Sequence, residues 1–126
     1  LDYDEFCYVS TATGIPEEDE QIFRQAWCSE NSQGKIRPTC MKQPNDWGLY
    51  DMSGNVYEWC LDDFVENPTG RLDPLIQYNS EHKVGRGGSY RSKEESIRTN
   101  NRSSTPPDMK TEFIGFRLVR TVVTVE

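Results

Sequence analysis

Apolar residues near the two ends of the chain follow the periods of regular secondary structure. Pro16 precedes a run of acidic residues, and proline and acids both favour the first turn of a helix. The apolar side chains that come next share one helical face: Ile22, Phe23, Ala26 and Trp27. This pattern predicts a short helix over residues 17–25. Near the other end, apolar residues alternate from Ile114 to Leu118 and predict a strand over residues 113–125.

The chain between these elements is rich in turn-forming residues. Residues 1–13 contain a strand-like run, and Val84–Tyr90 has the pattern of a strand that enters a glycine-rich bend. The segment from Trp47 to Trp59 is the densest in aromatic residues. Proline, glycine and asparagine predict loops over three further stretches, residues 29–44, 66–83 and 103–110.

Composition narrows the function classes. The 126 residues include 21 acids and 14 bases, so the net charge is −7, which argues against a partner made of nucleic acid. Hydrophobic residues make up only 34% of the chain, but aromatic residues supply 11% and bury a large area each. We therefore expect a folded domain with a small, aromatic-rich core. No apolar run approaches the ~18–20 residues of a transmembrane helix, so we expect no transmembrane segment.

Cysteine and histidine usage limits metal and redox chemistry. The four cysteines, Cys7, Cys28, Cys40 and Cys60, could form two disulfides in three connectivities, and their spacing does not choose a compartment. We expect Cys60, beside Trp59, to be buried or in a disulfide. His82 is the only histidine, so the chain alone cannot build a three-histidine iron or zinc site. Its polar surroundings favour a surface loop residue over a catalytic base.

Two carboxylates flank a tight turn in the aromatic segment. Asp51 and Glu58 lie on either side of Gly54-Asn55, and carboxylates with backbone carbonyls are the oxygen ligands that calcium prefers. An alternative interpretation is structural: Asp51 and Asn55 would cap turns, and Glu58 would pair with a buried arginine such as Arg117.

The C-terminal third holds a glycine-rich run and most of the arginines. Gly85–Ser89 lacks the spacing of a phosphate-binding loop, so its glycines more simply serve backbone geometry. The arginines could neutralise acids of the same chain or line an anion or peptide groove, and pairing is the favoured interpretation. The candidate groove residues are Ser89, Arg102 and Arg117.

Four motifs, in this order, carry a family resemblance. Together they resemble the formylglycine-generating enzyme/sulfatase-modifying-factor domain family, and with the run AWCSENS from Ala26 the resemblance spans about residues 26–120. The motifs are PNDWGLYDMSGNVYEW (Pro44–Trp59), RGGSY (Arg86–Tyr90), Arg102 and GFRL (Gly115–Leu118).

The resemblance implies the fold class and the domain organisation. It implies an α+β, C-type-lectin-like fold with short strands, few helices and long ordered loops. Family members carry an earlier block similar to RLPTEAEWEYA, which residues 1–25 do not contain. We therefore expect residues 1–25 to be an N-terminal segment without family match, and residues 26–126 to be the C-terminal part of such a domain.

The resemblance also implies a structural calcium ion. Family members bind calcium through the stretch that aligns with Asp51, Gly54, Val56 and Glu58, using two side chains and two backbone carbonyls. All four positions are chemically suitable here, and an ion would tie down irregular backbone.

Catalytic residues of the family are absent. The oxidases bind copper(I) through two cysteines shortly after the GGS motif, but no cysteine follows Cys60 in this chain. We therefore expect no copper, no catalytic residue and no iron site of the sulfoxide-synthase kind; Ser89 alone is retained from that pocket.

Two functions remain after these exclusions. The first is a non-catalytic binding or assembly module that recognises a protein or peptide through its loops, or docks with the remainder of its own polypeptide. The second is a formylglycine-generating type of enzyme whose site is altered or completed elsewhere, using Cys28 or Cys60 as a reactive thiol. An extracytoplasmic location, periplasmic, cell-surface or secreted, fits either function.

Overall fold

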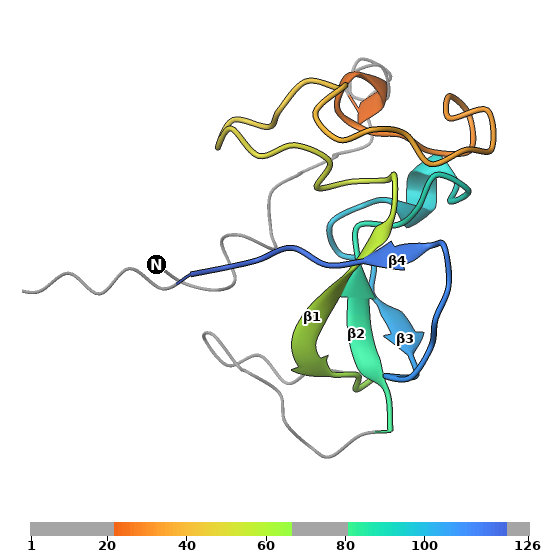
Figure 1. Ribbon diagram of the computed structural model, residues 1–126, viewed down its shortest axis with the longest axis vertical. Coiled ribbons are helices and arrows are strands. Elements are labelled where there is room, and N and C mark those ends of the chain that lie inside the picture. Colours follow the sequence, from red (N-terminus) through yellow and green to blue (C-terminus); the bar gives the residue numbers. More distant parts are fainter. Residues whose placement is uncertain (1–21, 67–80, 121–126) are drawn as a thin grey trace, which may run out of the picture.

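A small twisted sheet organises the molecule. The computed structural model describes residues 22–66 and 81–120. Four strands lie in the order β3-β2-β1-β4, and one short 3-10 helix, η1 (Glu94–Ser96), lies between β2 and β3 in sequence (Figure 1). The strand bounds are β1 Tyr57–Asp63, β2 Lys83–Arg86, β3 Ser103–Thr105 and β4 Ile114–Gly115.

Strand β1 is the longest and pairs on both sides. It runs antiparallel to β2, with Glu58 opposite Arg86, and parallel to β4, with Tyr57 opposite Ile114. The register with β2 shifts between Trp59 and Asp63, which marks an irregularity of the bulge type. Loops that precede β1 and follow β2 gather at one end of the sheet (Figure 1).

The predicted strands are only partly right. The strand expected over Val84–Tyr90 is β2, and the glycine-rich bend follows it at Gly87 and Gly88, both with positive φ. The strand expected over residues 113–125 is wrong in extent: β4 has two residues, residues 116–120 are not in a strand, and the rest lies outside the described residues.

The loop expected over residues 103–110 is also partly wrong, because its first three residues form β3. Polar side chains are tolerated there because Gly85, on the neighbouring strand, leaves them room. A Cβ on Gly85 would lie 2.4 Å from the Ser103 Oγ, and that hydroxyl instead donates to the Gly85 carbonyl at 3.2 Å.

The core is small, as the composition predicts. Helical backbone over residues 22–25 confirms the end of the predicted helix, whose first residues lie outside the described part. Its apolar face packs against the loop after η1, in a cluster made of Ile22, Ala26, Cys28 and Ile97 with Phe23 beside it. In the described chain, no helix is long and apolar enough to span a bilayer. The strand-like run in residues 1–13 lies outside the described residues.

Candidate functional site

A tight turn at Gly54-Asn55 lies at the centre of the candidate site. The Gly54 amide donates to the Gly87 carbonyl, and the Asn55 amide donates to the Trp27 carbonyl, both at 2.7 Å. Gly54 has φ +75°, and a Cβ there would lie 2.1 Å from the Trp27 oxygen. Only glycine fits this approach, so the turn locks three distant segments together.

The side chains around the turn satisfy loop backbone. Asn55 accepts from the Arg37 amide and donates to the Arg37 carbonyl, each at 3.0 Å. Asp51 accepts from the Cys40 amide at 2.9 Å through Oδ2. These contacts match the alternative in which Asp51 and Asn55 hold turns, and they explain how a polar loop stays ordered.

Glu58 pairs with Arg117 in a two-pronged ion pair. Arg117 donates from Nε to Glu58 Oε2 at 2.8 Å and from Nη2 to Oε1 at 2.7 Å. The same Nη2 donates to the Tyr50 carbonyl at 2.8 Å. Hydrogen bonding to Glu58 raises the pKa of Arg117 above its ordinary value. The pair joins β1 to the residues that follow β4, as the structural alternative predicts.

The second carboxylate oxygen of Asp51 has no hydrogen-bond partner. Asp51 is only 8% exposed, and its Oδ1 is buried without a hydrogen-bond partner. The amide nitrogen of Asn45 is likewise buried and unpartnered. Both residues line a cavity of about 10 Å³ with Gln25, Gln43, Leu49, Met52 and Ser53. Such a volume is at the lower limit for one water molecule or ion.

The residues aligned with calcium ligands therefore differ in whether their oxygens are already paired within the chain. Asp51 fits an ion, because a buried carboxylate oxygen without a partner is costly and a cation would offset that cost. Glu58 would have to release or share Arg117. Within residues 22–66 and 81–120, no three acidic, histidine or cysteine side chains come close enough to hold a metal, so any ion would also need carbonyl oxygens.

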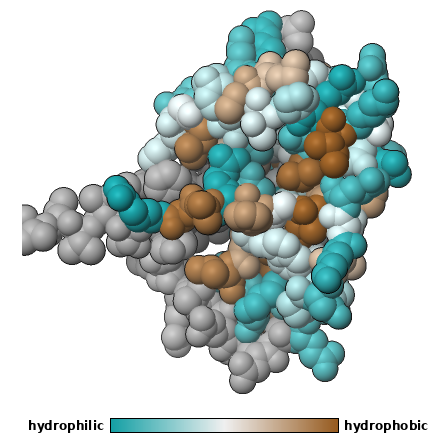
Figure 2. Space-filling view, viewed as in Figure 1, coloured by the Kyte–Doolittle hydropathy of each residue, from teal (hydrophilic) through white to brown (hydrophobic). Residues whose placement is uncertain are grey.

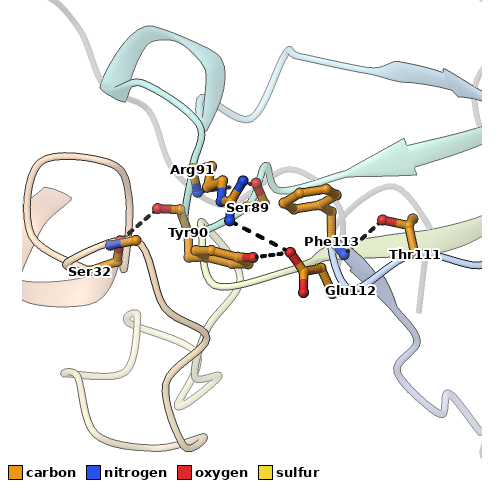
Figure 3. A network of polar contacts seen from close by, with 8 residues as sticks. Ser32, Ser89, Tyr90, Arg91, Thr111, Glu112 and Phe113 are labelled. Carbon is orange, nitrogen blue, oxygen red and sulfur yellow. Dashed lines mark hydrogen bonds and ion pairs between the residues drawn. The ribbon is translucent and has the colours of Figure 1, made fainter.

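Ser89 and its neighbours form a compact polar and aromatic cluster. Ser89 is 3% exposed, its Oγ lies 3.3 Å from Ser92 Oγ, and its amide donates to that oxygen at 2.9 Å. Tyr90 is buried, stacks on Phe113 at 5.6 Å, and donates from its hydroxyl to Glu112 at 2.9 Å (Figure 3). Burial and the Glu112 hydrogen bond raise the pKa of Tyr90.

Arg91 covers this cluster from outside. Its guanidinium lies 5.5 Å from the Tyr90 ring and 5.3 Å from the Phe113 ring, and 3.7 Å from Glu112 (Figure 3). Ser32 donates to the Tyr90 carbonyl at 2.7 Å, which ties the cluster to the loop after the helix. The positions after Ser89 are thus filled by packed side chains.

Arg102 has a separate role at the end of β1. It donates to the Val65 carbonyl at 2.6 Å and lies 5.1 Å from the Phe64 ring. Ser89, Arg102 and Arg117 thus make their contacts at three different places in the described chain. The structure brings Arg117 to the calcium-ligand stretch, and it does not join the three residues into one groove.

The described cysteines are all thiols. Cys28 is fully buried, and burial raises its pKa to about 11, with a contribution from a Glu30 hydrogen bond. Cys40 is exposed, and Cys60 is half-buried, so the expectation of a buried or disulfide-linked Cys60 is wrong. Cys60 is only partly covered at its position on β1, which the sequence could not reveal. Cys7 lies outside the described residues.

Sequence reasoning missed two groups of residues. Asn45 was read only as part of a motif, yet its amide faces the same cavity as Asp51. Glu112 lies between the predicted loop and strand and Phe113 at the predicted strand start, yet both complete the cluster at Tyr90. No local pattern signals the roles of Glu112 and Phe113, because their partner Tyr90 lies more than twenty residues away.

A family model described as "Sulfatase-modifying factor enzyme 1-like domain" matches residues 6–122. The match starts ahead of the boundary expected at residue 26, and that boundary stays a prediction. The chain is 35% identical to a formylglycine-generating enzyme of Streptomyces coelicolor, over 71% of its own length and 30% of the relative. It is 36% identical to a serine/threonine-protein kinase, pkn1, of Chlamydia pneumoniae, over 63% of its length and 14% of the relative.

Two solved structures share the fold. The Treponema denticola variable protein 1 superposes with a TM-score of 0.74 at 29% identity, over 86% of this chain and 39% of that one. PvdO from Pseudomonas aeruginosa gives 0.68 at 26% identity, over 85% of this chain and 41% of that one. These matches confirm the expected fold class, and the chain spans about two fifths of each of these structures.

Proposed function

Since this chain belongs to the sulfatase-modifying factor enzyme 1-like domain family, we propose that it is a non-catalytic binding or assembly module built on that family's fold. The observation that carries the proposal is the packing after Ser89. In the stretch after Tyr90, where the family resemblance puts copper-binding cysteines, this chain has no cysteine, and Arg91 packs over the rings of Tyr90 and Phe113. A packed side-chain cluster of this kind leaves no thiolate pair for copper(I).

The remaining thiols support the same proposal. A catalytic cysteine needs a depressed pKa and access to substrate. Cys28 has the opposite properties, since it is fully buried and its pKa is raised to about 11. Cys40 is accessible, but an exposed thiol alone does not supply a substrate site.

The alternative is a formylglycine-generating type of enzyme completed by further polypeptide. It is favoured by the 35% identity to the Streptomyces coelicolor enzyme, of which this chain spans 30%. In this alternative, further polypeptide supplies the catalytic groups, so the two functions differ in chemistry and share the scaffold.

The decisive experiment is an activity assay with metal analysis. The purified chain would be incubated with a cysteine-containing sulfatase peptide and copper(I), and the peptide mass would be followed for conversion of cysteine to the aldehyde. The binding module predicts no conversion and no stoichiometric copper. Conversion above a no-protein control would overturn the proposal and establish the enzyme.

A structural calcium ion at residues 51–58 is part of this proposal. The buried, unpartnered Oδ1 of Asp51 supports it, with the Gly54 and Val56 carbonyls and Glu58 as the further ligands. The ion would hold the turn that locks Trp27 and Gly87. The module would act outside the cytoplasm, where free calcium is abundant enough for a weak site of about 10⁻⁴–10⁻³ M.

A chelator experiment tests the ion. Chelation should lower the melting temperature of the parent chain but leave that of Asp51→Asn unchanged, because the variant has already lost the ligand. Asp108→Asn, which changes a carboxylate at an exposed position, serves as the matched control and should respond to chelator as the parent does. An unchanged melt of the parent would leave Arg117 as the sole cation of the site and exclude calcium.

A further inference from the structure

The segment that follows β4 presents large apolar side chains to solvent. Phe116 is 75% exposed, Leu118 is 87% exposed and Val119 is 57% exposed. In Figure 2, hydrophobic atoms line this segment where it leaves the sheet. Isolated exposed apolar residues are ordinary, but three within four consecutive residues mark an interaction surface.

The register shows which face of the sheet leads into this segment. Tyr57 pairs with Ile114 and Glu58 pairs with Gly115, so the two strands alternate in step and Ile114 lies on the Tyr57 face, opposite to Glu58. Residues 116–120 continue from β4 outside any strand, with Arg117 held against Glu58 and with Phe116 and Leu118 exposed to solvent.

That opposite face continues over β1. Residues two apart in a regular strand share a face, so Tyr57 and Trp59 lie on it, and Leu61 follows where the register with β2 shifts. Leu61 is 62% exposed, and no residue of β1 before Asp63 is buried, although β1 is an inner strand of the sheet. An inner strand with an apolar face normally has a layer packed over it.

The outer backbone edge of β4 also indicates an interaction surface. β4 is the last strand of the sheet, and among the described residues it pairs only with β1. The Arg117 contacts to Glu58 and the Tyr50 carbonyl hold the following residues in place. The edge is therefore a fixed template for an added strand.

We infer that a complementary polypeptide segment, one that supplies the part of the sulfatase-modifying-factor fold absent from this chain, docks on β4 and covers Phe116, Leu118 and Leu61. The occupant follows from the superpositions, because most of this chain matches only 39% and 41% of the two solved structures. This inference rests on the proposed function and names the partner of the assembly module. The occupant carries apolar side chains and an extended strand.

A chimera tests the inference. This chain would replace the matched two fifths of the Treponema denticola variable protein 1, and amide hydrogen exchange over residues 114–119 would be compared between the chimera and the isolated chain. Docking predicts a soluble monomer whose amides in this segment exchange slower by on the order of tenfold or more.

Matched double variants distinguish docking at this surface from nonspecific hydrophobic association. Phe116→Ser with Leu118→Ser should abolish the added protection and lower the melting temperature of the chimera. Ile36→Ser with Met41→Ser changes two other exposed apolar residues and should do neither.

Equal exchange in both proteins, or a chimera that aggregates, would overturn the inference. Protection in the isolated chain that appears with dimer formation would also overturn it, because the occupant would then be a second copy. The aldehyde assay is independent of these readouts: turnover by the isolated chain would reject the binding module, whereas fast exchange in the chimera rejects only this docking surface.

Discussion

One ion pair, Glu58–Arg117, joins the turn at residues 51–58 to the segment at residues 116–119. The two regions differ in how their polar groups are paired and their apolar side chains are buried. The turn is closed by contacts within the chain: Asn55 is buried, and its backbone and side chain bond to three segments. The segment after β4 is anchored through Arg117, and its apolar side chains Phe116, Leu118 and Val119 are exposed to solvent.

The difference shows which kinds of contact this chain makes with itself and which it does not. Most polar contacts of the turn, which require geometry but little area, are made within the described chain, and Asp51 Oδ1 is the exception. Apolar burial, which requires a second layer, is not completed over β1 and β4. Loops held by hydrogen bonds within the chain, beside apolar side chains that are exposed to solvent, support the proposed assembly module.

Replacing Gly54 should break the turn most severely. Gly54→Ala would place a Cβ 2.1 Å from the Trp27 oxygen at φ +75°, so at least about 3 kcal/mol of stability should be lost. Gly34→Ala is the control, because φ is +66° there but no atom lies within 4 Å, and roughly 1–2 kcal/mol is expected. Urea unfolding measures both, and equal costs would contradict the close approach.

Removing the charge of Glu58 should loosen the link between the two regions. Glu58→Gln leaves Arg117, whose side chain is 33% exposed, with one weaker acceptor, and should cost about 1–3 kcal/mol. A double-mutant cycle with Arg117→Met isolates the pair. A coupling energy near zero would show that the pair does not hold the segment after β4.

Titration of Cys28 should lower stability at high pH. The folded-state pKa is raised from 9.0 to about 11, so the folded protein keeps the thiol proton while the unfolded chain loses it. The free energy of unfolding should therefore fall as pH rises from 9 toward about 11, and be unaffected below pH 9. Cys28→Ser should remove this dependence, and Cys40→Ser should keep it; the reverse pattern would reject the burial argument.

Polar substitution after β4 should have the smallest effect on the isolated chain. Leu118→Ser should change the free energy of unfolding by less than about 0.5 kcal/mol, since the side chain is 87% exposed. Ile97→Ala, in the core, should cost about 2–5 kcal/mol. A comparable loss at Leu118 would mean that this segment already packs within the chain.

Local pattern predicted much of the candidate site. Glycine at position 54, the acids at 51 and 58 and the strand before Gly87 all follow from residue type and spacing, because turns and short strands are local. The Glu58–Arg117 pair was also predicted, as the structural alternative to calcium, although the Arg117 side chain is 33% exposed rather than buried.

Residue identity alone established the acidic charge and the absence of cysteines beyond position 60, because these are properties of the chain itself, and the motifs implied the fold through a family resemblance. Tertiary structure decided the rest. It placed β3 in a run of polar residues, limited β4 to two residues, and left Phe116 and Leu118 uncovered, because each outcome depends on which distant segment lies alongside.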